Sequence, residues 1–283
     1  MQVFDRIAPL RAALREARVA GQRVGLVPTM GALHEGHRSL IRRARAENEF
    51  VVVSLFVNPT QFGPNEDFAR YPRAFDQDRQ MAEAEGVDAL FAPPVEEMYP
   101  PGFQTMVDVP ELGSILEGAH RPGHFRGVTT VVTKLFAIVQ PDRAYFGRKD
   151  YQQLSILRRM ARDLDFPVEI VPCPTVREPD GLAMSSRNAY LSPEERREAT
   201  VLYRALQMAE ERVRAGARDP QALRQEMEAM IASEPDAQVD YVALVDPETL
   251  QPVADLSAGP TLAVLAVRIG KTRLIDNWLL PHS

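Results

Sequence analysis

The sequence predicts an α/β protein in which a Rossmann-like, doubly wound parallel sheet is followed by a smaller α+β domain. Apolar runs alternate with helical patterns through the first two-thirds of the 283 residues, and this order of elements is typical of a parallel sheet covered by helices. Several runs are apolar almost without interruption, as expected for strands that are buried on both faces. After Arg177 the pattern changes to helices followed by short strands.

The sheet of the first domain is expected to consist of short apolar runs. These strands are predicted at residues 23–27, 50–57, 89–92, 143–146 and 168–171. Helical patterns lie between them and are predicted at residues 36–48, 72–85, 128–139 and 151–164. Ligands of such sheets bind beyond the carboxyl ends of the strands. The segments that follow Val27, Val57 and Phe146 are therefore the first places to search for a site.

A second domain is predicted at residues 176–283, after a first domain at residues 1–175. Residues 178–181, Glu-Pro-Asp-Gly, are a turn signal. Residues 192–195, Ser-Pro-Glu-Glu, indicate a helix start, with proline in the first turn and a glutamate at capping-box spacing. A long Arg- and Glu-rich helix is expected from there, then a helix at 220–233 and strands at 239–245, 261–267 and 272–278. This small α+β domain is expected to serve as a lid.

Composition narrows the classes of function. Hydrophobic residues make up 45% and charged residues 25% of the chain, which are ordinary values for a globular protein. The net charge of −6 gives no broad basic surface, so nucleic acid is not an expected partner. The single cysteine, Cys173, excludes an internal disulfide. No run has transmembrane length, and arginines occupy the N-terminus where a signal peptide would be apolar. A cytoplasmic enzyme without a membrane partner is therefore expected.

The most informative segment is residues 27–38, Val-Pro-Thr-Met-Gly-Ala-Leu-His-Glu-Gly-His-Arg, which joins an expected strand to an expected helix. His34 and His37 are three residues apart and share one face of a helical turn. Gly31 and Gly36 allow the backbone to approach a ligand closely, and the N–H groups of a helix start attract an anion. The segment predicts a site for a nucleotide triphosphate. Taken alone, an ordinary strand-to-helix turn with surface histidines explains it equally well.

Two further segments combine polar groups with apolar surface. In residues 56–63, Asn58 and Gln61 supply amide groups and Phe62 an apolar wall, which suits a small ligand with hydroxyls, a carboxylate and an alkyl body. An Asn-Pro turn that only fixes the chain path is an equal alternative. Residues 121–128, Arg-Pro-Gly-His-Phe-Arg-Gly-Val, are basic and lead into a helix. They either position an anion or form a solvated loop.

Residues 146–153, Phe-Gly-Arg-Lys-Asp-Tyr-Gln-Gln, follow another expected strand. Lys149 and Gln153 are four residues apart and lie on one helical face. A lysine at a helix start opposes the helix macrodipole, so a nearby anion would explain its place. An exposed lysine is the alternative, but its position after the carboxyl end of a strand favours a functional role.

Residues 182–188, Leu-Ala-Met-Ser-Ser-Arg-Asn, lie near the junction of the two domains. They place two hydroxyls and a guanidinium on one loop, from Ser185, Ser186 and Arg187. Such groups suit phosphate oxygens, especially if the loop closes during reaction. A plain polar linker would have a similar sequence.

Together, five ordered blocks resemble one family. Residues 28–37 are similar to the HIGH-type signature of the nucleotidyltransferase superfamily, and Met-Ser-Ser-Arg at 184–187 is similar to the KMSKS-type loop that accompanies it. With Phe-Val-Asn-Pro-Thr-Gln-Phe, Arg-Pro-Gly-His-Phe, Phe-Gly-Arg-Lys-Asp-Tyr-Gln-Gln and Arg-Glu-Pro-Asp-Gly-Leu-Ala-Met-Ser-Ser-Arg-Asn, the resemblance is to the pantothenate synthetase family. It covers essentially the whole chain. It implies ATP-dependent condensation of (R)-pantoate with β-alanine to pantothenate, AMP and pyrophosphate through a pantoyl-adenylate.

The resemblance implies which residues act on the nucleotide. The implied catalytic residues are His34, His37, Lys149, Ser185, Ser186 and Arg187. ATP is expected to contact all of these, together with Pro28, Thr29, Met30, Gly36, Gly147, Asp150 and Met184. Mg²⁺ is expected to bridge the phosphates, with water and phosphate oxygen in most of its coordination shell. Asp76 and Asp78 are expected outer contacts of the ion, and a solvated helix face explains them equally well.

The same resemblance implies the acid site and the assembly. Pantoate and β-alanine are expected to contact Met30, Asn58, Gln61, Phe62, Arg121, Val131, Val132 and Gln153. For Val131 and Val132, packing in the helix core is a strong alternative. The family also implies a homodimer.

Two residues depart from the family pattern. Arg148 stands where the family often has an acidic or amide residue, and Arg38 where an apolar residue is common. Both are expected to point away from the pocket.

Two other functions compete with this interpretation. One is a different adenylate-forming enzyme of the same superfamily, such as an aminoacyl-tRNA synthetase-like ligase, but no strongly basic domain or tRNA-binding extension is evident. The other is a non-catalytic nucleotide-binding protein with the same fold. Such a protein would tolerate loss of Lys149 or of the Ser-Ser-Arg loop, yet both are present.

Overall fold

The computed structural model describes residues 1–64 and 66–281. Contacts within the chain group its residues into two compact units. The N-terminal unit comprises Met1–Arg148 and Gln153–Pro174, and the C-terminal unit comprises Lys149–Gln152 and Thr175–Ser283.

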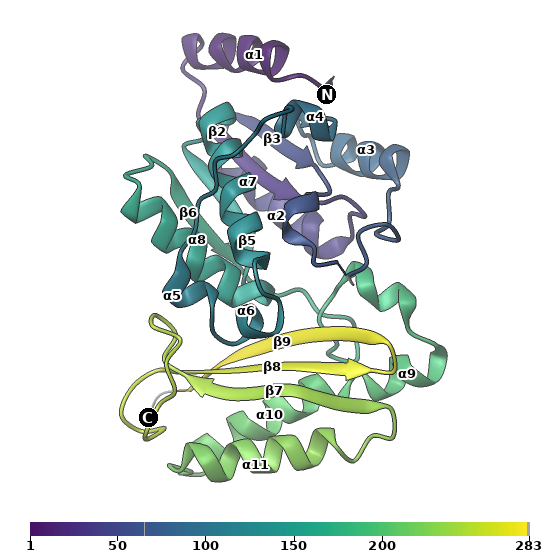
Figure 1. Ribbon diagram of the computed structural model, residues 1–283, viewed down its shortest axis with the longest axis vertical. Coiled ribbons are helices and arrows are strands. Elements are labelled where there is room, and N and C mark those ends of the chain that lie inside the picture. Colours follow the sequence, from purple (N-terminus) through teal and green to yellow (C-terminus); the bar gives the residue numbers. More distant parts are fainter. Residues whose placement is uncertain (65, 282–283) are drawn as a thin grey trace. The chain divides into compact units, whose positions relative to one another are not determined.

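The N-terminal unit is built on a six-stranded sheet with the strand order β1-β4-β3-β2-β5-β6 (Figure 1). All neighbouring strands are parallel, which confirms the predicted α/β class. The strands are β1 (Gln2–Phe4), β2 (Val24–Thr29), β3 (Phe50–Leu55), β4 (Ala89–Phe91), β5 (Arg143–Gly147) and β6 (Glu169–Cys173).

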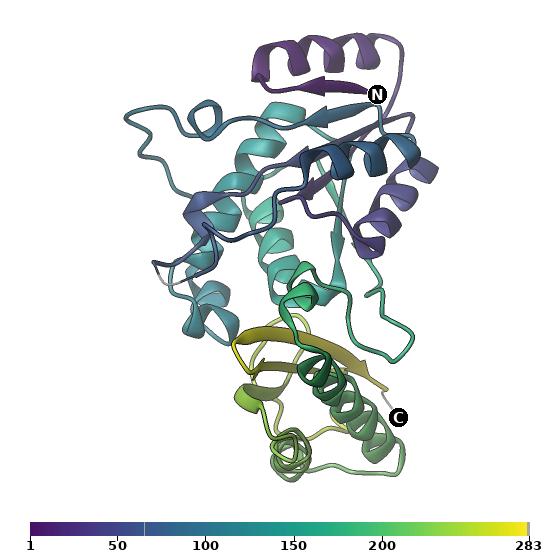
Figure 2. The ribbon, with the colours of Figure 1, turned by 90° about the vertical axis from the view of Figure 1, so that its right-hand side faces the viewer.

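Both faces of this sheet are covered, as its apolar strands require. In β3, Val52 faces one hydrophobic cluster, while Val51 and Val53 face another, because successive side chains of a strand point to opposite faces. The first cluster is closed by α1 (Ile7–Val19), α7 (His124–Val139) and α8 (Tyr151–Asp163), and the second by α2 (Glu35–Glu47) and α3 (Phe75–Ala84). Figure 2 shows the helices of this unit on both sides of the sheet.

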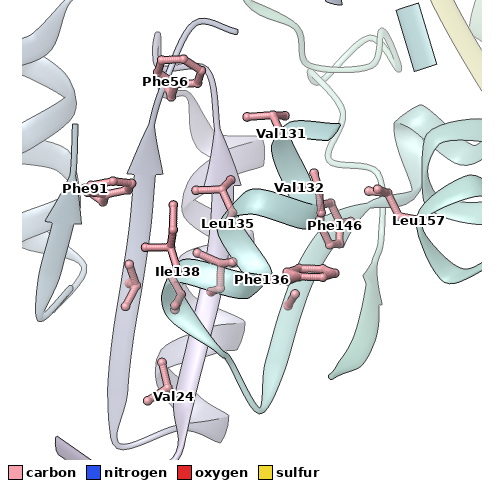
Figure 3. Close-up of a cluster of buried hydrophobic side chains, with 14 of the residues drawn as sticks. Val24, Phe56, Phe91, Val131, Val132, Leu135, Phe136, Ile138, Phe146 and Leu157 are labelled. Atoms are coloured by element: carbon pink, nitrogen blue, oxygen red, sulfur yellow. The ribbon is translucent and has the colours of Figure 1, made fainter. Parts of the chain in front are cut away.

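Helix α7 forms the centre of the larger cluster. Its side chains in this cluster include Val131, Val132, Leu135, Phe136 and Ile138, which lie with Phe56, just after β3, and Phe146 in β5 (Figure 3). Val131 and Val132 are 6% and 4% exposed, so both pack in the core, the alternative noted for them above. Burial of each such side chain stabilises the fold by about 1.5–3 kcal/mol. The helix is thereby packed against one face of the sheet.

The C-terminal unit is a three-stranded antiparallel sheet with helices on one face. Its strands are β7 (Ala237–Val245), β8 (Thr261–Ile269) and β9 (Thr272–Leu280), and its helices are α9 (Pro193–Glu198), α10 (Val201–Arg214) and α11 (Pro220–Ile231). Short helical turns complete the chain: α4 (Val95–Met98), α5 (Pro110–Gly113), α6 (Glu117–His120), and the 3-10 turns η1 (Pro59–Gln61), η2 (Arg148–Asp150) and η3 (Ser186–Tyr190).

The structure differs from the sequence prediction in several elements. Strand β1 was not predicted, because a three-residue edge strand has too few residues to show a period. Helix α1 was not predicted either. The long helix expected after Ser192 is two helices, α9 and α10. Ser192 and Glu195 do form the predicted capping box. The break after Glu198 coincides with a tertiary bond, in which its Oε2 accepts from the Asp236 backbone N–H at 3.0 Å.

The helix predicted at 72–85 begins only at Phe75. Arg73 donates from its guanidinium to the carbonyls of Tyr71 and Phe68, and these bonds hold the preceding residues in a loop. Across the described part of the chain, no helix is both long and apolar enough to cross a bilayer.

Candidate active site

The loop after β2 has an unusual backbone. Gly31 and Ala32 both have positive φ, 84° and 52°, and for alanine this left-handed conformation is strained. Two groups hold the loop. The Thr29 hydroxyl accepts from the Gly31 N–H at 3.2 Å, and the Asp78 carboxylate accepts from the N–H groups of Ala32 at 2.9 Å and Leu33 at 2.7 Å. Asp78 therefore fixes the path of the chain into α2.

Asp78 is 4% exposed, and each of its carboxylate oxygens accepts a backbone N–H. Burial raises the pKa of Asp78, and the bonds from Leu33 and Ala32 oppose that rise. The Asp78 side chain therefore bonds to the loop and does not lie on a solvated helix face. Its neighbour Asp76 is exposed on α3.

His34 and His37 cap the N-terminus of α2, and a backbone N–H group fixes the tautomer of each ring. The Nδ1 atom of His34 accepts from the Gly36 N–H at 3.1 Å, and Nδ1 of His37 accepts from the His34 N–H at 3.3 Å. A neutral imidazole whose Nδ1 accepts must carry its proton on Nε2. The two rings lie 4.1 Å apart. The helix start thus presents two imidazole N–H donors beside its own positive end, an arrangement that suits a phosphate group.

Arg38, the next residue, forms ion pairs with Glu85 at 2.6 Å and Glu35 at 3.5 Å. Its positive charge is thus bound to two carboxylates of the same unit.

The turn after β3 is held from within. Asn58 is 1% exposed, and its side chain bonds to Thr60, Gln61, Tyr99 and Gly127. Gln61 is 8% exposed and donates from Nε2 to the Met30 sulfur at 3.1 Å. This contact brings together the segments after β2 and β3, as expected for neighbouring parallel strands. Phe62 packs against the rings of Phe68 and Tyr71.

Arg121 is already paired with carboxylates. Its guanidinium bonds to both oxygens of Glu66, and Nη1 lies 3.5 Å from Glu117. The same Nη1 lies 3.1 Å from Nε2 of His124. Because arginine can only donate, this His124 nitrogen accepts. Arg121 is thus part of a partly buried network in which two acidic side chains face its charge.

His124 links this network to the Gln61 turn. Its Nδ1 lies 2.8 Å from the Gln61 carbonyl oxygen, which can only accept, so Nδ1 carries the proton. Burial, followed by the charge of Arg121, lowers the pKa of His124 to about 4. The imidazole is therefore neutral at pH 7 and acts as a fixed bridge between Arg121 and the turn.

A cavity of about 240 Å³ opens beside Met30. Its walls are mainly apolar and include Phe56, Val57 and Phe75, with Arg73 and Asp78 as the charged residues. Of the residues predicted to form the acid site, Met30 lines this cavity.

Lys149 and the Ser-Ser-Arg loop belong to the C-terminal unit. The Lys149 ammonium lies 3.5 Å from the Asp150 carboxylate, and the Lys149 carbonyl accepts from Asn277 at 2.7 Å. Ser185 caps η3 by accepting from the Arg187 N–H at 3.3 Å. The loop is thus a defined turn that begins at Ser185, with Ser186 and Arg187 in its first residues.

The segment before this loop is anchored by a buried ion pair. Arg177 donates to both oxygens of Asp276 and to the Gly181 carbonyl. Its guanidinium also stacks on the rings of Tyr203 and Trp278, at 4.7 and 5.1 Å. Asp276 is 1% exposed on its side chain, so loss of Arg177 would leave a buried, unpaired charge.

Comparisons with known proteins identify the family. The model of the Pantoate-beta-alanine ligase family matches residues 2–279. The chain is 58% identical over 280 residues to the pantothenate synthetase of Moorella thermoacetica and 61% identical to that of Roseiflexus castenholzii, with 99% of each chain covered. This chain belongs to the pantoate–β-alanine ligase family.

Solved structures agree with this membership. The pantothenate synthetase of Thermus thermophilus superimposes with a TM-score of 0.94 at 54% identity, covering 99% of this chain and 100% of that one. The pantoate-beta-alanine ligase of Francisella tularensis, solved with beta-gamma ATP and beta-alanine, gives a TM-score of 0.82 at 37% identity, covering 99% and 97%. The predicted fold of a ligase of this family is thereby confirmed over both units.

Several residues that shape the site were not predicted from the sequence. Asp78 was expected only as an outer contact of a metal, and Tyr99, Glu66 and Glu117 were not singled out. His124 lies three residues after Arg121 at the start of α7, a spacing that brings both side chains to one helical face. Tyr99 contacts Asn58 across 41 residues, a separation at which the sequence carries no local signal.

Proposed function

We propose that this chain condenses (R)-pantoate with β-alanine at the expense of ATP, releasing AMP and pyrophosphate through a pantoyl-adenylate. Membership of the pantoate–β-alanine ligase family over essentially the whole chain supports the overall reaction. The observation that carries the proposal is the His34–His37 pair. Both Nδ1 atoms accept backbone N–H groups, so both Nε2 atoms are donors at the start of α2.

In the first step, the pantoate carboxylate attacks the α-phosphorus of ATP and pyrophosphate leaves. Negative charge increases on the phosphoryl oxygens, and catalysis of such transfers depends mainly on positioning and on stabilisation of that charge. We propose that His34 and His37 donate to these oxygens, together with Lys149 and the loop of Ser185, Ser186 and Arg187. One well-placed donor is worth about 10²–10³ in rate.

The remaining ATP contacts follow the family pattern. Pro28, Thr29, Met30 and Gly36 lie on or beside the loop between β2 and α2, and we propose that they shape the nucleotide pocket. Gly147, Asp150 and Met184 complete the ATP contacts in the proposal. Asp150 is also the ion-pair partner of Lys149, so the two side chains meet the nucleotide as one unit.

In the second step, the β-alanine amine attacks the activated carbonyl and AMP leaves. We propose that Gln61 and Gln153 hold the pantoate polar groups beside Met30 and Phe62. Val131 and Val132 of α7 pack in the hydrophobic core, and we propose that they support the apolar side of the pantoate site. Arg121 is proposed to act on β-alanine through its paired network, because Glu66 and Glu117 already face its charge.

We propose that Mg²⁺ enters as its complex with ATP. Within residues 1–64 and 66–281, no group of three or more His, Cys, Asp and Glu side chains is arranged to hold a metal ion. Asp78 uses both carboxylate oxygens on backbone N–H groups. Mg²⁺ bound through phosphate and water needs no such group of protein ligands. Bound in this way, the ion would neutralise phosphate charge.

We further infer a cytoplasmic homodimer, on the resemblance to the family. Sedimentation of the purified chain would test the dimer.

The decisive experiment is pantoate-dependent exchange of pyrophosphate into ATP, with Mg²⁺ present and β-alanine omitted. Exchange is expected, because the adenylate forms reversibly before the amine arrives. Lys149→Ala should reduce exchange by about 10²-fold or more, in line with the loss of one charge-stabilising donor. Retention of exchange within a few-fold would disprove the phosphate role of Lys149. If folded protein gives neither exchange nor pantoate-dependent AMP after β-alanine is added, the proposed function is wrong.

A further inference from the structure

The buried side chain of Asn58 has every hydrogen-bonding position in use. Its Nδ2 donates to the Gln61 Oε1 at 3.0 Å and to the Gly127 carbonyl at 3.1 Å. Its Oδ1 accepts from the Tyr99 hydroxyl at 2.8 Å, from the Thr60 hydroxyl at 3.0 Å and from the Thr60 N–H at 3.4 Å. A primary amide has two donor hydrogens and two acceptor lone pairs. Asn58 is therefore saturated by protein groups.

Two backbone groups fix which way the Asn58 amide faces. The Thr60 N–H can only donate and the Gly127 carbonyl can only accept. The oxygen of Asn58 must face the first and its nitrogen the second, as observed. The second hydrogen of Nδ2 then needs an acceptor, and Gln61 Oε1 is the atom placed there.

Tyr99 also favours this orientation of the Asn58 amide. Its hydroxyl lies against the acceptor end of Asn58, so it donates there. Its ring is held by Phe103, at a centroid distance of 5.1 Å, and by Phe56 at 6.1 Å. Burial raises the pKa of Tyr99, so the hydroxyl keeps its proton over the working pH range. The bonds run in one direction, from Tyr99 to Asn58 to Gln61.

This direction decides what Gln61 can offer to a ligand. Its Oε1 is taken by Asn58, while its Nε2 faces the Met30 sulfur at 3.1 Å. A thioether is a weak acceptor, and a carboxylate or hydroxyl oxygen in the same place would be a stronger one. Reversal of the Gln61 amide would set two N–H donors, Asn58 Nδ2 and Gln61 Nε2, against each other.

We propose that Tyr99 and Asn58 are positioning residues that lock the Gln61 amide with its N–H groups toward the acid substrate. Asn58 acts through Gln61 rather than by touching the substrate itself. The inference rests on the proposed function only in naming pantoate as that acid. It specifies an oxygen acceptor as the substrate atom that Gln61 meets.

The first test removes the Tyr99 hydroxyl and keeps its ring, with Tyr99→Phe. The matched control is Tyr145→Phe, because the hydroxyl of the buried Tyr145 also makes hydrogen bonds in the same unit, to Asn48 at 2.7 Å and Glu47 at 2.9 Å. Loss of one neutral hydrogen bond is worth about 2- to 10-fold, and we expect Tyr99→Phe to lower kcat/KM for pantoate by that factor. The KM for ATP should not change. An equal effect on both substrates, or no effect beyond that of Tyr145→Phe, overturns the role of Tyr99.

The second test compares Gln61→Glu with Gln61→Ala and determines whether Gln61 acts as a hydrogen-bond donor or acceptor toward the substrate. Glutamate has the shape of glutamine but offers only acceptors. One oxygen would bond to Asn58, and the other would face the pantoate carboxylate with like charge. Gln61→Glu should therefore bind pantoate at least as poorly as Gln61→Ala. If Gln61→Glu retains activity within about 3-fold of the parent, less than the loss of one hydrogen bond to a charged group, Gln61 acts as an acceptor and the proposal is wrong.

A third measurement does not depend on turnover. Side-chain amide NMR of the folded protein should show slow hydrogen exchange for the Asn58 NH₂, and Tyr99→Phe should accelerate it while Tyr145→Phe leaves it unchanged. If this result is obtained but the parent protein shows no pantoate-dependent pyrophosphate exchange, the proposed function is wrong, while the hydrogen-bonded orientation of Asn58 and Gln61 is supported. If the Asn58 NH₂ exchanges fast in the parent protein, the proposed positioning of Gln61 is wrong, whatever the activity.

Discussion

The loop after β2 and the turn after β3 lie at the ends of paired strands, yet different kinds of contact hold them. The strands run in register from Val24 with Phe50 to Thr29 with Leu55. In the loop, the histidines bond to backbone within three residues of themselves, and one distant carboxylate, Asp78, holds the strained part. In the turn, Asn58 also bonds locally to Thr60 and Gln61, but further contacts come from the remote residues Tyr99, His124 and Gly127.

This difference predicts how substitutions affect the two halves of the proposed site, the nucleotide half at the β2 loop and the acid half at the β3 turn. The β2 loop has a local cap and one long-range tether, so a single substitution should release it without disturbing the sheet. The β3 turn is braced by α7 and by the chain around Tyr99, so its geometry depends on the core. We therefore expect the nucleotide half to be sensitive to one carboxylate and the acid half to be sensitive to packing.

The largest effect is expected from Asp78→Asn. Asparagine keeps one acceptor but turns an NH₂ group toward the other backbone N–H, so one of the N–H groups of Ala32 and Leu33 loses its partner. A displacement of about 1 Å in a catalytic group can cost about 10²-fold in rate, and we expect that loss in pyrophosphate exchange. Glu83→Gln, an exposed change on the same helix, should have no effect. If Asp78→Asn retains pyrophosphate exchange within about 3-fold of the parent, far less than the loss that misplacement causes, the loop does not depend on the Asp78 carboxylate for its conformation.

A smaller effect, on the acid half, is expected from Gly127→Ala. The added Cβ would lie 2.3 Å from the Thr60 carbonyl oxygen and 2.6 Å from the Gln61 nitrogen, both of them backbone atoms. Overpacking costs about 1–3 kcal/mol, against a gain of about 1 kcal/mol from alanine in a helix. We expect a lower free energy of unfolding and a raised KM for pantoate, with the KM for ATP unchanged.

The control for this packing change is Gly259→Ala, where the added Cβ meets nothing within 4 Å among the described residues. Denaturant titration and steady-state kinetics of both variants make the comparison. If Gly127→Ala raises the KM values for pantoate and ATP equally, the two halves are coupled and the contrast drawn between them is wrong.

The smallest effect is a pH dependence of stability from His124. Its pKa is lowered from 6.5 to about 4 in the folded protein, so between these values the unfolded chain binds more protons. Stability from this group is fully present above pH 6.5 and is lost as the pH falls toward 4. Between about pH 7 and about pH 5.5 the loss should be about 1 kcal/mol. The charged groups around the ring are Arg121, Glu117 and Glu66.

Denaturant titrations of the parent and of His124→Asn across this range would isolate the effect. Asparagine can still donate to the Gln61 carbonyl and accept from Arg121, but it does not titrate. The variant should lack the slope that the parent shows over this range. Identical slopes in both proteins would mean that His124 is not the group responsible.

Elements with a local signal were predictable from the sequence. The apolar runs of β2 to β6 mark buried strands, and the capping box at Ser192 marks a helix start because its bonds span three residues. His34, His37 and Gly36 are near one another in the chain, so their chemistry was accessible as well. The break between α9 and α10 was not predicted, because it coincides with the bond between Glu198 and Asp236.

By itself, the sequence determined the α/β class and the segments that carry chemistry, because backbone periodicity and short-range capping act over a few residues. The tertiary structure decided how those side chains are used. It closed the Asp78 tether across 45 residues and set the direction of the Gln61 amide through Tyr99. A buried polar group must find a partner wherever the fold supplies one, and hydrogen-bond direction passes along that chain of partners. Neither leaves a pattern in the local sequence.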